Sequence, residues 1–171
     1  MNILKVSVLV SFTLLLTNCK TQTITTINKT LYEQALQGLN NRHFEIQMEE
    51  YQDLSIPDNA VEFPLGYIYV YGNEVIVRYS KDFKYSPLID SSYMKYESSQ
   101  ILNRKTNRKG DLSFDLKVNH ETFRYENVFQ ITLFKNSNKC FVQVKSWDNE
   151  KYATIKGVFI GYSDHEKFIN K

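Results

Sequence analysis

Hydrophobic and polar residues alternate along most of the chain from residue 43 onwards. The clearest stretch runs from Asp111 to Val118, where every second side chain is apolar. Comparable stretches are 44–49, 67–71, 74–79, 127–134, 140–147 and 152–160. A period of two is typical of β-strands that bury one face. The connections at 135–139 and 148–151 are too short for crossover helices, so the pattern predicts antiparallel pairing.

The dipeptide Gly72-Asn73 predicts one β-hairpin with a defined register. A two-residue turn of this type pairs Tyr71 with Glu74 and Ile68 with Val77. In that register one face of the hairpin is aliphatic and is expected in the core: Ile68, Val70, Val75 and Val77. The opposite face can pack rings while hydroxyl groups stay in water. It carries Tyr67, Tyr69, Tyr71, Glu74, Ile76 and Arg78.

One amphipathic helix is expected before the strands. Thr30 and Glu33 have the spacing of a capping box, in which each side chain accepts from a free backbone N–H of the first turn. Apolar residues then recur at helical spacing, at 31, 32, 35, 36 and 39. Gly38 and Asn40-Asn41 indicate the end of the helix. Its single apolar face has to pack against the strands.

These elements predict a mainly β fold. We expect a curved antiparallel meander, barrel-like or half-open, of about seven to nine strands with one short N-terminal helix. A two-sheet sandwich is the alternative. The segment 80–99 has weak periodicity and is expected to hold a loop and an edge strand, and Val61–Phe63 is expected to add a short strand.

The first residues have the pattern of a lipoprotein export signal. Lys5 precedes the apolar run Val6–Leu16, which is too short to span a bilayer and is typical of a signal peptide. The following Leu16-Thr17-Asn18-Cys19 resembles the bacterial lipobox, whose Cys becomes the acylated first residue of the mature chain. We expect a signal peptide over 1–18, a lipid anchor on Cys19, a tether over 19–29 and one β-rich domain over 30–171. An ordinary signal peptide or an uncleaved anchor is the alternative.

Composition supports one globular domain and excludes some functions. The 171 residues are 42% hydrophobic and 23% charged, as in folded domains. A net charge of +2 is too balanced for a nucleic-acid-binding protein, which needs a basic stripe. With Cys19 assigned to the lipid, the second cysteine, Cys140, has no disulfide partner. We expect Cys140 to be buried as a small apolar residue.

The order of these elements resembles small Bacteroidetes lipoproteins with domain of unknown function 4251. Three short motifs carry the resemblance: Tyr71-Gly72-Asn73-Glu74 at the first hairpin, Tyr125–Ile131 with Cys140–Val144 as two paired strands, and Ala153–Gly157 near the end. The resemblance covers about residues 30–162. It implies a lipidated N-terminus, a short helix and a β-meander, and it implies no known activity.

The sequence contains no set of residues that indicates catalysis, a metal or a cofactor. His43, His120 and His165 are isolated and are interpreted as surface or turn residues. Ser163-Asp164-His165 are consecutive and cannot align as a catalytic triad. The glycines are scattered and form no phosphate-binding loop. We therefore expect a protein without enzymatic activity or a cofactor.

These observations favour a lipid-anchored cell-envelope protein of a Gram-negative bacterium that acts as a binding or scaffolding module. The alternatives are a small hydrophobic-ligand carrier and, less favoured, a hydrolase. The location expected is the outer membrane, facing the periplasm, with the cell surface as the alternative.

Two groups of residues are candidates for binding. The candidates for contact with an envelope protein, a glycan or a lipid are Tyr67, Tyr69, Tyr71 and Arg78. The candidates for contact with an anionic membrane surface are Arg104, Lys105, Arg108 and Lys109.

Overall fold

The computed structural model describes residues 24, 26–54, 66–79, 93–119, 126–146 and 148–162. Nine strands lie in these ranges: β1 His43–Asp53, β2 Gly66–Tyr71, β3 Glu74–Tyr79, β4 Tyr93–Tyr96, β5 Ser98–Thr106, β6 Leu112–Asn119, β7 Glu126–Leu133, β8 Lys139–Lys145 and β9 Lys151–Gly161. The segment predicted as a signal peptide, Cys19, the strand expected at 61–63, His120 and the segment 163–165 lie outside the described residues.

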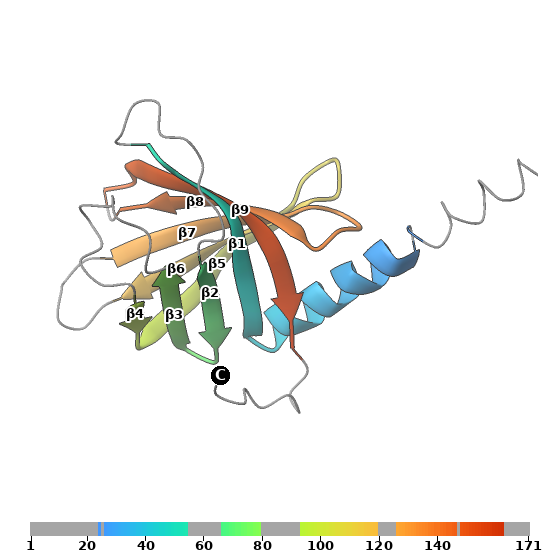
Figure 1. Cartoon of the computed structure of the whole chain (residues 1–171), viewed down its shortest axis with the longest axis horizontal. Coiled ribbons are helices and arrows are strands. Elements are labelled where there is room, and N and C mark those ends of the chain that lie inside the picture. Colours follow the sequence, from blue (N-terminus) through green and yellow to red (C-terminus); the bar gives the residue numbers. More distant parts are fainter. Residues whose placement is uncertain are drawn as a thin grey trace, which may run out of the picture.

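All nine strands form one antiparallel sheet in the order β4-β3-β2-β1-β9-β8-β7-β6-β5. The sheet curls into a nearly closed barrel (Figure 1). Its two edges, β4 and β5, are consecutive in sequence and are separated only by Glu97. One continuous stretch of chain therefore pairs with β3 through its first half and with β6 through its second half. The predicted antiparallel meander is confirmed, and the alternative, a sandwich of two sheets, is not what the described strands form.

The predicted hairpin register is confirmed. Tyr71 pairs with Glu74 and Ile68 pairs with Val77 across the β2–β3 turn, where Gly72 adopts a φ of +58°. The predicted edge strand corresponds to β4. The four aliphatic side chains of this hairpin are fully buried.

Among the described residues, large side chains pack together in the barrel interior. The rings of Phe44 and Phe159 stack with centroids 4.6 Å apart, and Phe114 meets both edge-on at 6.4 Å. Other strands contribute fully buried aliphatic side chains, among them Ile131 and Ile155. Burial of this apolar surface is the main favourable term in folding.

The N-terminal helix runs over residues 26–40 and lies against one end of the barrel (Figure 1). It begins earlier than predicted. Thr30 lies inside the helix, where its hydroxyl donates to the carbonyl of Thr26, and so it does not cap the helix. The last four residues of the expected tether, 26–29, are therefore helical. Ala35 and Leu39 are buried in the barrel core. Among the described residues, no helix combines the length and the apolar character that crossing a bilayer requires.

Arg42 connects β5, one edge of the sheet, to the β2–β3 turn. It lies between the helix and β1 with a φ of +53°. Its guanidinium donates to the Gly72 carbonyl at 2.6 Å and to the Ser99 carbonyl and hydroxyl at 3.1 and 2.8 Å. The Ser99 hydroxyl in turn donates to the Asn73 carbonyl at 2.9 Å. These bonds tie the start of β5 to the β2–β3 turn.

Candidate functional site

The predicted tyrosine face lies on the outer surface of β2, next to β1 and β9. In the β1–β2 register, Tyr71 is opposite His43, Tyr69 is opposite Glu45 and Tyr67 is opposite Gln47. The chain after β9 brings Tyr162 to the same place, because its backbone N–H donates to the His43 carbonyl at 3.0 Å. Residues more than a hundred positions apart thus share one outer surface.

His43 is at the centre of an aromatic cluster formed by Tyr69, Tyr71 and Tyr162. Its ring lies 5.0 Å from the rings of Tyr71 and Tyr162 and 6.0 Å from that of Tyr69, measured between centroids. His43 Nε2 and the Tyr69 hydroxyl form a hydrogen bond of 3.1 Å. The imidazole is only 4% exposed, and its Nδ1 is buried without a hydrogen-bond partner among the described residues.

The interpretation of His43 as a surface or turn residue was wrong. The residue begins β1 and points outward, which is the position that the local pattern indicates. It is buried because β2 and the end of β9 place three tyrosine rings around it. The pairings of β1 with β2 and with β9 are long-range, and the sequence near residue 43 does not predict them.

Glu45 continues this surface along β1. Its side chain is 6% exposed, and its carboxylate accepts a hydrogen bond of 3.1 Å from the Tyr162 hydroxyl. No cation pairs with this carboxylate among the described residues. Burial raises the pKa of the Tyr69 phenol, and Tyr71 and the charge of Glu45 raise it further. The Tyr69 hydroxyl therefore stays protonated and able to donate.

A concave groove of about 670 Å³ begins at Glu45 and follows the outer side of β1. Its lining residues are Glu45, Gln47, Met48, Glu49, Glu50, Gly66, Tyr67 and Val158. A β-bulge between Met48 and Glu50 shifts the register with β9 at this point. Because a bulge inserts one extra residue, Glu49 and Glu50 both reach the outer surface. The groove is therefore bordered by carboxylates.

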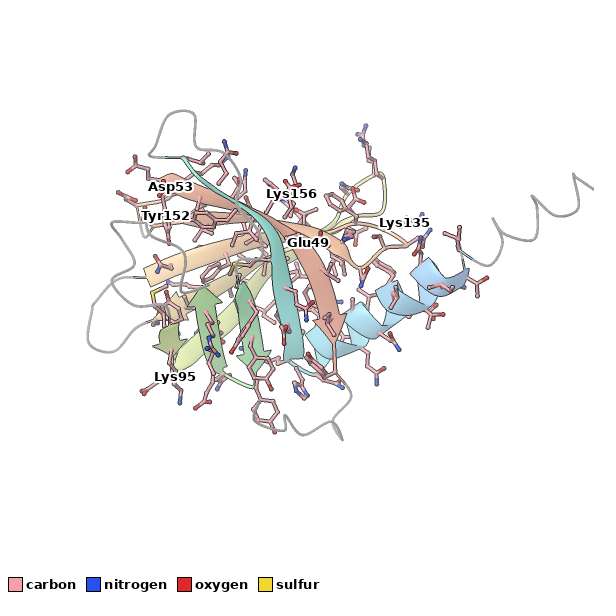
Figure 2. All side chains as sticks on the ribbon, in the orientation of Figure 1. Glu49, Asp53, Lys95, Lys135, Tyr152 and Lys156 are labelled. Atoms are coloured by element: carbon pink, nitrogen blue, oxygen red, sulfur yellow. The ribbon has the colours of Figure 1, made fainter. Side chains whose placement is uncertain are left out.

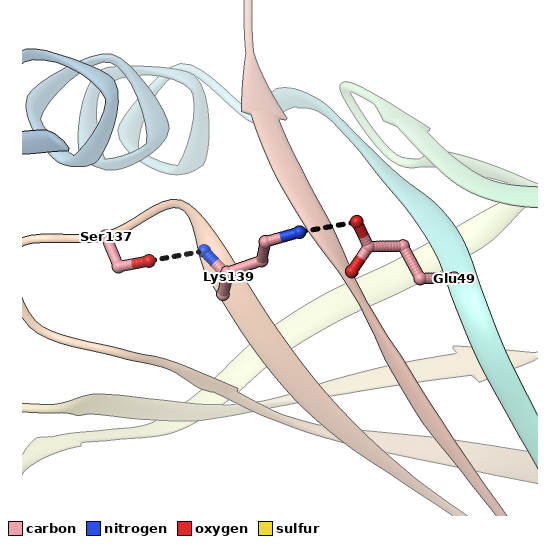
Figure 3. A network of polar contacts seen from close by, with 3 residues as sticks. All are labelled: Glu49, Ser137 and Lys139. Carbon is pink, nitrogen blue, oxygen red and sulfur yellow. Dashed lines mark hydrogen bonds and ion pairs between the residues drawn. The ribbon is translucent and has the colours of Figure 1, made fainter. Parts of the chain in front are cut away.

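Two of these three carboxylates are already neutralised by lysines. Lys139 of β8 reaches across β9 and pairs with Glu49, while its backbone N–H donates to the Ser137 hydroxyl (Figure 3). Lys156 of β9 pairs with Glu50 at 2.5 Å, and Figure 2 shows Glu49 and Lys156 on the same side of the barrel. Glu45 is the buried carboxylate of the groove for which the described chain supplies no cation.

The structure divides the predicted tyrosine candidates between the two parts of this surface. Tyr67 lines the groove, whereas Tyr69 and Tyr71 surround His43. Arg78 is exposed on β3 opposite Tyr67. Sequence reasoning missed His43, Glu45 and Tyr162. The one local signal was the period-two position of Glu45, outward on a strand that was correctly predicted.

The basic candidates lie elsewhere, on β5 and the β5–β6 connection. Arg104 donates to the Asn40 side chain at the end of the helix, at 2.7 Å. Lys105, Arg108 and Lys109 are exposed. Arg104 thus lies at the end of the helix, and none of the four cations lines the groove.

The remaining reactive groups form no further site in the described chain. Cys140 is a free, buried cysteine, which agrees with its predicted role as a small apolar residue. Burial, followed by the charge of Glu49, raises the pKa of Cys140 to about 12. No group of three or more potential metal ligands occurs among the described residues.

Comparison with known proteins shows which solved structures have a similar fold. No family model matches the chain, and no curated protein sequence is detectably similar to it. Among solved structures, a DUF4251 family protein from Bacteroides eggerthii matches with a TM-score of 0.61 over 80% of this chain and 91% of that chain. The two sequences are 11% identical, a level at which the likeness concerns the fold alone. The chain is therefore similar in fold to a DUF4251 family protein, a family named for its unknown function.

Proposed function

We propose that this chain is a lipid-anchored, non-enzymatic binding module of a Gram-negative cell envelope, related to the DUF4251 lipoproteins. Its export signal and the lipobox-like Leu16–Cys19 support the anchor. Its similarity in fold to a DUF4251 family protein supports the relationship. The outer membrane, facing the periplasm, is the location proposed.

One observation carries the binding role: Glu45 is a buried carboxylate at the wall of an open groove, and no described cation neutralises it. A buried charge is costly unless it is paired. The adjacent His43 Nδ1 adds an unsatisfied buried atom, which costs about 1–3 kcal/mol. A partner that brings hydrogen-bond donors and a positive charge into the groove lowers the cost at Glu45, which lines it.

The chemistry of the groove favours a basic protein segment as the partner. An Arg or Lys side chain inserted beside Tyr67 can reach Glu45 and lie against an aromatic ring. The neighbouring rings of Tyr69, Tyr71 and Tyr162 form a preorganised aromatic platform, and Tyr is enriched among residues that dominate binding energy. Binding of an amino-bearing glycan at the same place would be a different outcome of the test.

Site-directed photo-crosslinking in the native envelope tests this surface. The photoreactive residue p-benzoyl-phenylalanine replaces Tyr67, and in a control it replaces Lys117 on the far outer face at β6. We expect a discrete protein adduct from position 67 and none from position 117. Adducts at both positions, or at neither, would contradict the proposed surface, and capture of a glycan would exclude a protein partner.

Two matched substitutions then test the role of Glu45. In Glu45→Gln the unpaired carboxylate is lost, and we expect the Kd for the captured partner to rise about thirtyfold or more, equivalent to about 2 kcal/mol. In Glu50→Gln the carboxylate lost is one that Lys156 already neutralises, so the Kd should change much less. Equal effects of both substitutions would contradict the central role of Glu45.

The anchor is tested through the two cysteines. Cys19→Ala should abolish incorporation of a labelled fatty acid and move the protein from the detergent phase to the aqueous phase. Cys140→Ala is the matched control. It keeps Cys19 and should stay lipidated, because the buried Cys140 thiol is not the proposed lipidation site. Unchanged membrane fractionation of Cys19→Ala would refute the lipid anchor.

A further inference from the structure

Three segments project toward the same side of the barrel. They are the start of the helix, the β5–β6 connection at 107–111 and the β7–β8 connection at 134–138 (Figure 1). We call this side the hairpin end. Figure 2 shows Lys135 at this side, whereas Tyr152 and Asp53 lie at the opposite end of the barrel.

The hairpin end is rich in positive charge. Residues 103–110 contain four cations and no acid, and Arg108 and Lys109 are exposed at the tip. The neighbouring tip adds Lys135, whose side chain lies directly over Gly110. Asp111 holds the two tips together by accepting hydrogen bonds of 3.0 Å from the Lys135 backbone N–H and from the Asn107 side chain. The tips therefore present their cations as one surface.

Exposed apolar side chains occur on the same segments. Ile24 and Ile27 at the start of the helix are 60% and 53% exposed. Phe134, at the base of the β7–β8 tip, and Leu102, on the strand leading to the β5–β6 tip, are each 41% exposed. Ile24, Ile27 and Phe134 lie on the segments that define the hairpin end, and they are three of the six exposed large hydrophobic side chains among the described residues.

We propose that the hairpin end docks on the surface of an anionic phospholipid bilayer. The inference rests on the proposed lipid anchor at Cys19, which precedes Ile24 by only five residues. Five extended residues reach at most about 17 Å, so an anchored Cys19 keeps this end near the headgroups. The lysines and arginines then face anionic headgroups, while Ile27 and Phe134 contact the apolar boundary beneath them. Docking by this end turns the opposite end of the barrel away from the membrane.

Docking is measured with a fluorescent probe on the lipidated full-length protein reconstituted into vesicles. The probe is attached to Ser137→Cys at the hairpin end, or to Glu150→Cys in the β8–β9 connection at the other end of β8. Cys19 is acylated and Cys140 is buried, so the introduced thiol is the one labelled. Vesicles of phosphatidylethanolamine with phosphatidylglycerol are compared with vesicles of phosphatidylcholine, each containing a nitroxide-labelled lipid quencher.

We expect quenching of the probe at 137 on phosphatidylglycerol vesicles, little quenching at 150, and loss of quenching as salt screens the headgroups. Each cation near an anionic surface favours the docked state about fivefold. Arg108→Glu with Lys109→Glu should therefore lower the ratio of docked to undocked protein about 25-fold or more. The matched control, Lys145→Glu with Lys151→Glu, reverses two charges at the opposite end and should leave the ratio unchanged.

The outcomes separate this inference from the proposed function. Protein that enters the vesicles while the probe at 137 remains unquenched, or while both probes are quenched equally, would overturn the docking surface and leave the anchor standing. Protein that does not enter the vesicles would refute the anchor and, with it, the docking.

Discussion

Gly38 of the helix lies against Gly161 of β9. This contact decides whether Gly38→Ala raises or lowers the free energy of unfolding. A Cβ atom at position 38 would lie 2.3 Å from the Gly161 Cα and 2.7 Å from the His43 carbonyl oxygen. Both are backbone atoms, so no flexible side chain can move aside. We expect Gly38→Ala to push the helix away from the barrel end.

Two effects of known size oppose each other in this variant. Alanine favours a helix over glycine by about 1 kcal/mol, which alone would stabilise the protein. Overpacking of a tight contact costs about 1–3 kcal/mol, and a backbone contact belongs at the upper end of that range. The net loss expected is about 1–2 kcal/mol in the free energy of unfolding. In a domain of this size that loss lowers Tm by roughly 2–8 °C.

Denaturant and thermal unfolding of the variants measure this loss. Gln37→Ala, at an exposed position in the same turn, is the control and should change the free energy of unfolding by less than about 0.5 kcal/mol. Gly161→Ala places its Cβ 2.0 Å from the Gln34 carbonyl oxygen and should also destabilise. The double variant should lose less than the sum, because one displacement of the helix relieves both clashes. A Gly38→Ala protein as stable as the wild type would refute the described helix packing.

Three further predictions follow from buried or hydrogen-bonded groups. Because the pKa of Cys140 is raised to about 12, about one thiol in ten thousand is ionised at pH 8, so Ellman's reagent should react only on unfolding; rapid reaction of the folded protein would contradict this burial. Arg42→Ala removes the donor to Gly72 and Ser99 and should lower the free energy of unfolding in denaturant by about 1–3 kcal/mol, whereas an unchanged midpoint would show that these bonds between β5 and the β2–β3 turn do not stabilise the fold. The Lys135 backbone N–H and then the Asn107 side chain lower the pKa of Asp111, so the ionised carboxylate stabilises the fold above about pH 4, and this contribution is lost as pH falls through the lowered pKa. Asp111→Asn should therefore show a smaller loss of stability between neutral and acidic pH, and an identical pH profile would be evidence against these bonds.

Local patterns predicted the parts of the fold that depend on neighbours in sequence. The Gly72-Asn73 turn sets the β2–β3 register, because a two-residue turn leaves only one way to pair its strands. The alternation in β6 predicted which side chains are buried, since successive residues point to opposite faces. The start of the helix was misplaced, because the Thr30–Glu33 pattern fits a capping box equally well when it lies inside a longer helix.

The candidate surface needed contacts between distant segments. Tyr69 and Tyr71 were predicted on an outer face, but their shared neighbour, His43, depends on β1 pairing with β2. Tyr162 joins them because β9 returns to pair with the other side of β1. The groove depends on the bulge after Met48, and a bulge leaves little trace in a period-two pattern.

The sequence by itself determined a β-meander with a helix before it, the core face of each clear strand, and the hairpin that carries the tyrosines. Only the tertiary structure decided that the outer edges meet at Glu97, that Glu45 is buried with no cation among the described residues, and that the cationic tips project toward the same side as the start of the helix. The physical reason is the range of the interactions. Periodicity and turn chemistry act over a few residues, whereas closure of the barrel brings together positions more than a hundred residues apart.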